Sequence, residues 1–119
     1  MGTFRVRLDV GDAGRERFEP VDALVDTGAS YTVLPSSLLQ DLGIVPHTRA
    51  RFLLADGREI ECDLGRAWIR VDGQEEFTLV VFGEEALLGA VTLEELRLAP
   101  DPVSKRLLPV PARLMLTAT

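Results

Sequence analysis

The feature that most constrains the fold of this chain is a strand-like alternation of apolar and charged residues, interrupted by Asp-Gly turns. Residues 4–10 alternate between the two classes, which is the period of a strand with one buried face. Within residues 51–82, Asp56-Gly57 and Asp72-Gly73 are dipeptides typical of tight hairpin turns. We therefore expect two hairpins there, and we interpret Asp56 as the first residue of a type I′ turn rather than as a catalytic group.

Two short helices are expected to interrupt the β pattern. Pro35 and Gly43 bracket a short run that includes apolar residues, and they stand where a helix commonly begins and ends. Thr92 and Glu95 have the spacing of a capping box, so a second short helix is expected to begin at Thr92. Residues 106–110 are expected to form a last strand, which their proline limits to an edge or a margin of the sheet.

The size of the chain suits one compact unit. With 119 residues and 46% apolar content, the chain can fill one packed core and has no material for a second. We therefore expect a single domain over residues 1–119.

The rare residue types exclude several kinds of site. Cys62 and His47 are the only cysteine and histidine, so the chain cannot form an internal disulfide or a Cys/His zinc site, and no metal or other cofactor is expected. Cys62 shares an alternating face with Ile60 and Leu64 and is expected in the core. His47 is interpreted as an exposed loop residue, and Trp68 as a core or interface residue.

The charge and the amino terminus bear on partners and location. The net charge of −6 is spread along the chain without basic clusters, which argues against a nucleic-acid partner. Residues 1–7 have no apolar core of a signal peptide, and Val6 stands where a myristoylation signal has Ser or Thr. No apolar stretch is long enough to span a bilayer. We expect a cytoplasmic protein without membrane attachment.

The candidate catalytic residue is Asp26, which opens the tripeptide Asp26-Thr27-Gly28 at the end of an extended run over residues 17–25. By itself the tripeptide also fits a polar turn, because Asp and Gly are common turn formers. Its surroundings add weight to the catalytic interpretation. Ala29 follows it directly, and a second segment, Leu87-Leu88-Gly89, comes about sixty residues later.

With these two segments the chain resembles the retropepsin-like aspartic proteases. Residues 98–110 resemble the end of the non-viral cellular members, and the resemblance covers nearly the whole chain. The resemblance implies an all-β, closed barrel-like domain with one or two short helices. It implies that Asp26 is catalytic, within an active-site loop that includes Thr27, Gly28 and Ala29. It also implies that a supporting segment is formed by Leu87, Leu88 and Gly89. It further implies a flap over the substrate cleft, formed by Ala55, Asp56, Gly57 and Arg58.

Aspartic proteases use two carboxyl groups that share one proton, because both cannot ionise cheaply at close range. One carboxylate takes a proton from water, the other polarises the scissile carbonyl, and no covalent intermediate forms. This chain has one Asp-Thr-Gly and is too short for two lobes. A second copy must then supply the second Asp26 through a two-fold contact. The expectation is a homodimeric endopeptidase acting on a peptide or protein substrate.

Two positions depart from the viral members of the family. Those members commonly carry Asp after Asp-Thr-Gly-Ala and Arg after the apolar-apolar-Gly segment, whereas this chain carries Ser30 and Ala90. A non-catalytic peptide-binding or dimerisation module of the same fold is therefore the alternative, and the intact tripeptide speaks against it. A serine or cysteine hydrolase is not indicated, because Thr32 stands where the nucleophile elbow requires glycine.

Overall fold

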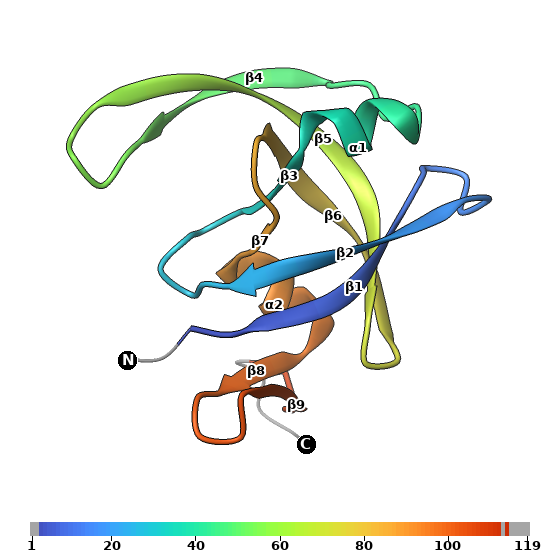
Figure 1. Cartoon of the computed structure of the whole chain (residues 1–119), viewed down its shortest axis with the longest axis vertical. Coiled ribbons are helices and arrows are strands. Elements are labelled where there is room, and N and C mark those ends of the chain that lie inside the picture. Colours follow the sequence, from blue (N-terminus) through green and yellow to red (C-terminus); the bar gives the residue numbers. More distant parts are fainter. Residues whose placement is uncertain (1–2, 113, 115–119) are drawn as a thin grey trace.

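The computed structural model describes residues 3–112 and 114 and is mostly β, as predicted (Figure 1). The predicted domain over residues 1–119 also includes residues 1–2, 113 and 115–119, which lie outside the described residues. The helices are α1 (Ser36–Asp41) and α2 (Ala90–Leu96). The strands are β1 (Arg5–Gly11), β2 (Phe18–Val25), β3 (Thr32–Pro35), β4 (Thr48–Leu53), β5 (Glu59–Val71), β6 (Gln74–Gly83), β7 (Leu87–Leu88), β8 (Leu98–Asp101) and β9 (Arg106–Pro109).

Seven of these strands form one sheet that closes on itself. The strand order is β1-β2-β7-β3-β6-β5-β4, and residues 9–11 of β1 also pair with residues 68–70 of β5. This extra pairing joins β1 to β5, so that six strands form a closed circuit while β4 pairs with the other half of β5. Closure satisfies backbone groups that an open sheet would leave at its edges. The predicted closed, barrel-like fold is confirmed.

Both predicted Asp-Gly hairpins are present, but their turns differ. At residues 72–73 both φ angles are positive, at 49° and 79°, as a type I′ turn requires. At Asp56-Gly57 only Gly57 has a positive φ, 89°, and its N–H donates to the Leu54 carbonyl at 3.0 Å. The Leu54 N–H in turn donates to the Arg58 carbonyl, which leaves a three-residue loop with a type I turn and a left-handed glycine. The predicted type I′ turn at Asp56 is therefore wrong.

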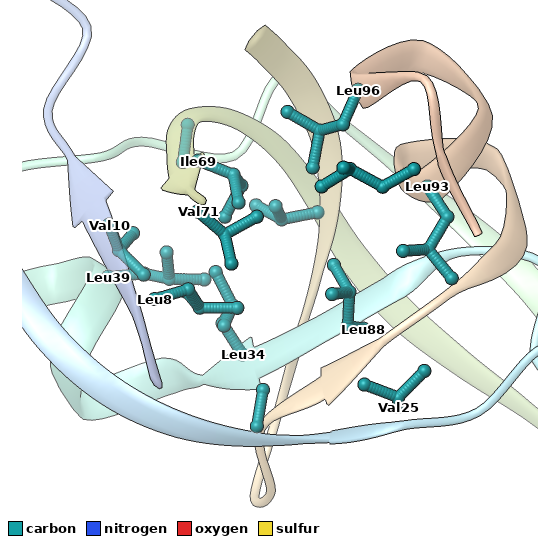
Figure 2. Packing of buried hydrophobic residues seen from close by; sticks show 14 of the residues in the cluster. Leu8, Val10, Val25, Leu34, Leu39, Ile69, Val71, Leu88, Leu93 and Leu96 are labelled. Atoms are coloured by element: carbon teal, nitrogen blue, oxygen red, sulfur yellow. The ribbon is translucent and has the colours of Figure 1, made fainter. Parts of the chain in front are cut away.

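The inside of the barrel is an apolar core to which almost every element contributes. Leu8 and Val10 of β1 are buried, whereas the charged residues between and before them are not, so the alternation in the sequence is the alternation of the strand. Figure 2 shows these side chains meeting others from β2, β3, α1, β5, β7 and α2: Val25, Leu34, Leu39, Ile69, Val71, Leu88, Leu93 and Leu96. Burial of each such side chain stabilises the fold by about 1.5–3 kcal/mol.

Helix α2 begins two residues earlier than the capping-box spacing predicted. Its first residue is Ala90, its N-cap is Gly89, and no side chain caps it. Thr92 is buried inside the helix, and its hydroxyl bonds to the hydroxyl of Thr32. The predicted capping box is wrong because two first-turn amides, those of Ala90 and Val91, donate to backbone carbonyls of the β2–β3 loop instead.

The remaining predicted elements are present. Helix α1 directly follows Pro35, and Gly43 lies just beyond its end with a φ of 72°. Strand β9 pairs with β8 in a separate two-stranded sheet, which confirms the predicted last strand. In Figure 1 this small sheet lies beyond β1.

Candidate active site

Asp26 is the first residue of the loop that joins β2 to β3, here called the Asp26 loop (residues 26–31). Its N–H donates to the Leu88 carbonyl at 3.0 Å, and one carboxylate oxygen accepts the Gly28 N–H at 2.9 Å. A Cβ at position 28 would lie 3.1 Å from that oxygen, so glycine permits the close approach of its amide. The side chain of Asp26 is half-buried. The backbone of Asp26 is thus held by Leu88 and its carboxylate by Gly28, while part of the side chain remains accessible.

The supporting segment predicted from the sequence lies directly against this loop. Leu87 and Leu88 form β7, which is parallel to β2 and antiparallel to β3, so it lies between the two strands that flank the loop. The next residue, Gly89, packs so closely on the loop that a Cβ would lie 2.6 Å from the backbone of Tyr31. The amides of Ala90 and Val91 then donate to the carbonyls of residues 29 and 30, at 2.9 and 3.0 Å.

The β4–β5 hairpin projects beyond the barrel on the side of the Asp26 loop (Figure 1). Between the two lies a cavity of about 590 Å³. The rings of Tyr31, from the loop, and Phe52, from β4, meet edge to face with their centroids 5.9 Å apart. The cavity is lined mainly by apolar side chains and by loop backbone: Gly28, Ala29, Ser30, Tyr31, Val33, Arg51, Phe52, Leu53, Leu54, Ile60, Cys62, Val81, Phe82 and Gly83. Such a groove suits the apolar side chains of an extended peptide.

The tip of this hairpin is formed by the residues predicted for the flap, Ala55, Asp56, Gly57 and Arg58, all of which are exposed. The carboxylate of Asp56 accepts the backbone N–H of Arg58 at 3.0 Å and its Nε–H at 2.7 Å. These two bonds, the backbone one first, hold the pKa of Asp56 below its ordinary value of 3.8. The tip is therefore ordered by its own hydrogen bonds rather than by contact with the barrel.

A second hollow, of about 370 Å³, lies on the other side of the Asp26 loop. Asp26, Thr27 and Gly28 line it, together with Thr3 and with apolar residues from the start of the described chain, from β2 and from the β8–β9 region: Phe4, Val25, Pro100 and Pro102. Gly28 lines both hollows. Among the described residues, Asp26 is the only carboxylate that lines either of them. The described part of the chain thus places a single carboxylate at these hollows.

Residues 6–89, which include the Asp26 loop, both Asp-Gly hairpins and β7, match the family model described as aspartyl protease. The chain belongs to this aspartyl protease family. Its fold resembles that of EIAV protease, solved in complex with the inhibitor HBY-793, with a TM-score of 0.57 and 22% identity over 80% of this chain and 88% of that one. It also resembles the simian foamy virus (mac) protease, with a TM-score of 0.52 and 21% identity over 74% and 91%. Among curated proteins, no sequence matches the chain.

These findings confirm the retropepsin-like resemblance drawn from the two short segments. The two viral proteases are under 25% identical to this family member, so their likeness bears on the fold alone. The structure places the Asp-Thr-Gly tripeptide and the apolar-apolar-Gly segment in direct contact.

Some residues of this aspartyl protease lie elsewhere than the sequence predicted. Cys62 is half-buried and lines the cavity beside Ile60, so its predicted place in the core is wrong. The reason is that the β4–β5 hairpin extends past the barrel, where the face that Cys62 shares with Ile60 borders the cavity instead of the core, whereas Leu64 further along the strand is buried. Tyr31 and Phe52 were not singled out from the sequence, although the position of Tyr31 three residues after Gly28 was a usable signal.

The other two singled-out residues lie outside the candidate site. His47 is exposed in the loop before β4, as predicted. Trp68 is half-buried on β5, where it packs on Phe77 at 5.2 Å between ring centroids and donates to the Ala13 carbonyl at 3.2 Å. Neither residue lines the hollows beside Asp26.

Two further observations concern the described part of the chain. In residues 3–112 and 114, neither helix has the length or the run of apolar residues needed to cross a bilayer. Within the same residues, no three His, Cys, Asp or Glu side chains come together as a protein metal site would require.

Proposed function

We propose that this chain is an aspartic endopeptidase that hydrolyses peptide bonds with a water activated between two Asp26 carboxyls, one from each subunit of a homodimer. The observation that carries the proposal is the position of Asp26. Its carboxylate is anchored by the Gly28 amide and stays partly accessible. It lines the smaller of the two adjoining hollows, and no other carboxylate among the described residues lines either of them. A site of this kind is complete only when a second copy faces it.

The chemistry follows from the pairing of like charges. Two carboxyls held together share one proton, because ionising both would place two negative charges side by side. The ionised Asp26 takes a proton from water as the water oxygen attacks the carbonyl carbon, and the protonated Asp26 donates its proton to the carbonyl oxygen. When the tetrahedral intermediate collapses, the C–N bond breaks, the Asp26 that took the water proton gives it to the leaving nitrogen, and the other Asp26 takes a proton from a hydroxyl of the intermediate. The Gly28 N–H holds one oxygen of the Asp26 carboxylate in place.

The face around Asp26 has features that suit a second copy of the chain. Thr27 is exposed next to the smaller hollow, whose other walls are mostly apolar. Large apolar side chains on the neighbouring β8–β9 hairpin and just after it are also exposed, among them Val103 at 90%, Leu108 at 36% and Val110 at 40%. An isologous contact through this face would cover these side chains and bring the two Asp26 loops together.

The β4–β5 hairpin is proposed as a flap over the substrate. Among the described strands, β4 pairs only with β5, so the backbone groups on its other edge are free to bind an extended chain. The cavity beneath is lined by Tyr31, Phe52 and Ile60, which suit apolar substrate side chains. The proposed substrate is therefore an extended peptide or an unfolded protein segment.

Cleavage of an unfolded protein at several acidic to neutral pH values tests the proposal. Wild type should cleave, a statine-type inhibitor should block the cleavage, and Asp26→Asn should abolish it, because the amide keeps the volume but cannot act as base or acid. Asp22→Asn, an exposed carboxylate on β2, is the matched control and should cleave like wild type. Activity of Asp26→Asn close to that of wild type, with unfolding curves that coincide, would refute the assignment.

The same experiment separates the proposal from a non-catalytic peptide-binding or dimerisation module. Ser30 and Ala90 lack the charged groups found at these positions in viral members, which is the observation in favour of a module. A module would bind the inhibitor without cleaving any substrate.

A further inference from the structure

Three buried threonine hydroxyls form a continuous row of hydrogen bonds beside the Asp26 loop. Thr32 donates to Thr92 at 2.7 Å, and Thr92 and Thr78 lie 3.1 Å apart. The row begins with the Gly89 N–H, which donates to Thr32 at 3.1 Å, and ends at Glu95, which accepts from Thr78 at 2.5 Å. Because Thr78 uses its only proton in the bond to Glu95, Thr92 is the donor in the bond between Thr92 and Thr78. Each hydroxyl therefore donates once and accepts once.

This row stands out against its surroundings. Among the described residues, these three threonines are the only polar residues that are buried. A buried hydroxyl destabilises a fold unless it is hydrogen-bonded, and valine has nearly the same shape without that requirement. A fully satisfied polar row in an apolar core restricts the elements that carry it to one arrangement. The row thus indicates a need for one defined placement of β3, β6 and α2.

That placement decides how α2 holds the Asp26 loop. Thr32 directly follows the loop, and Thr92 is the third residue of α2. The first two residues of α2, Ala90 and Val91, donate to the loop carbonyls of residues 29 and 30. A shift of α2 along β3 would break both bonds and move the loop.

We propose that Thr92 is a positioning residue for the Asp26 carboxylate. Its hydroxyl fixes α2 against Thr32 and Thr78, and α2 then fixes the loop through the amides of Ala90 and Val91. The catalytic consequence rests on the proposed function of Asp26. The effect of Thr92 on the order of the Asp26 loop does not rest on that function, so either claim can fail without the other.

Thr92→Val tests the proposal, because it removes the hydroxyl and keeps the shape. Amide hydrogen exchange at Ala90, Val91 and Asp26 should become faster by about ten- to a hundredfold, since two hydrogen bonds are lost. With a cleaved peptide, kcat should fall on the order of ten- to a hundredfold while KM stays within about threefold, because the reacting group is misplaced and the cleft walls are not.

Two variants serve as controls. Thr92→Ser restores the hydroxyl and should return exchange and kcat to within about threefold of wild type. Val71→Ala weakens the core at the far end of β5, next to the 72–73 turn, and should lower overall stability without selectively speeding exchange in the loop.

A further variant covers the case in which Thr92→Val does not fold. Glu95→Ala removes the exposed acceptor at the end of the row, and the same amides should exchange about two- to tenfold faster, the effect of one hydrogen bond.

The outcomes that overturn the proposal are specific. The proposal fails if Thr92→Val leaves amide exchange in the Asp26 loop unchanged. It also fails if Thr92→Ser is as impaired as Thr92→Val, or if Val71→Ala speeds amide exchange in the loop as much as Thr92→Val does. If wild type cleaves no peptide but the exchange results are as expected, the proposed function fails and the positioning of the loop by Thr92 stands.

Discussion

Replacing Gly89 with alanine would place a methyl group against the backbone of the Asp26 loop. The added Cβ would lie 2.6 Å from the carbonyl carbon and oxygen of Tyr31 and 3.0 Å from the carbonyl oxygen of Ala29. Ordinary contact begins at 3.4 Å, so the loop must move by about 0.8 Å, which is the difference between 3.4 and 2.6 Å. The φ of −94° and ψ of 174° at Gly89 are open to alanine, so the effect is steric.

The size of the effect follows from this displacement. Forcing a methyl group into a packed site destabilises by about 1–3 kcal/mol, which lowers the Tm of a domain of this size by about 4–12 °C. A catalytic group displaced by nearly 1 Å loses about a hundredfold in rate. We therefore expect Gly89→Ala to lower both the Tm, measured by thermal unfolding, and kcat/KM on a peptide substrate.

Gly14→Ala is the matched control for this substitution. A Cβ at position 14 would lie 3.4 Å from the carboxylate oxygen of Glu16, a flexible exposed side chain, so stability should change by no more than about 0.5 kcal/mol. Its activity should match that of wild type. If Gly89→Ala behaves like Gly14→Ala in both measurements, the close approach of Gly89 to Tyr31 does not hold the loop, and the steric argument is refuted.

Three further predictions concern the dimer, the hairpin and pH. Adding Asp26→Asn protein to wild type under conditions of subunit exchange should lower total activity through mixed dimers, and activity strictly proportional to wild-type subunits would mean that each chain holds a complete site. Amide exchange in residues 53–60 should slow when a peptide inhibitor binds, and an unchanged hairpin would exclude it as the flap. Because the Arg58 N–H and guanidinium lower the pKa of Asp56 below 3.8, its stabilising effect is complete above 3.8 and is lost as the pH falls through the lower, folded value. The Tm difference between wild type and Asp56→Asn should therefore shrink well below pH 3.8, and a constant difference would contradict the role of the charge.

The sequence by itself determined the features that depend on near neighbours along the chain. The alternation over residues 4–10 is that of β1, because side chains of a strand point to opposite faces in turn. The 72–73 turn has the geometry expected of Asp-Gly, since two residues with positive φ fit a two-residue loop. Asp26 directly follows the end of β2. Glycine stands two residues later because a Cβ at position 28 would crowd the Asp26 carboxylate that accepts its N–H.

Tertiary structure alone decided the features that depend on contacts between distant segments. The start of α2 was mispredicted because its first amides are satisfied by loop carbonyls about sixty residues earlier, so no capping side chain is needed. Cys62 borders the cavity because the hairpin that carries it extends past the barrel. The closing pair of β1 with β5 and the insertion of β7 beside Asp26 likewise join residues about sixty positions apart. No local pattern encodes such pairings, because burial and hydrogen bonding across the barrel select them only when the whole sheet closes.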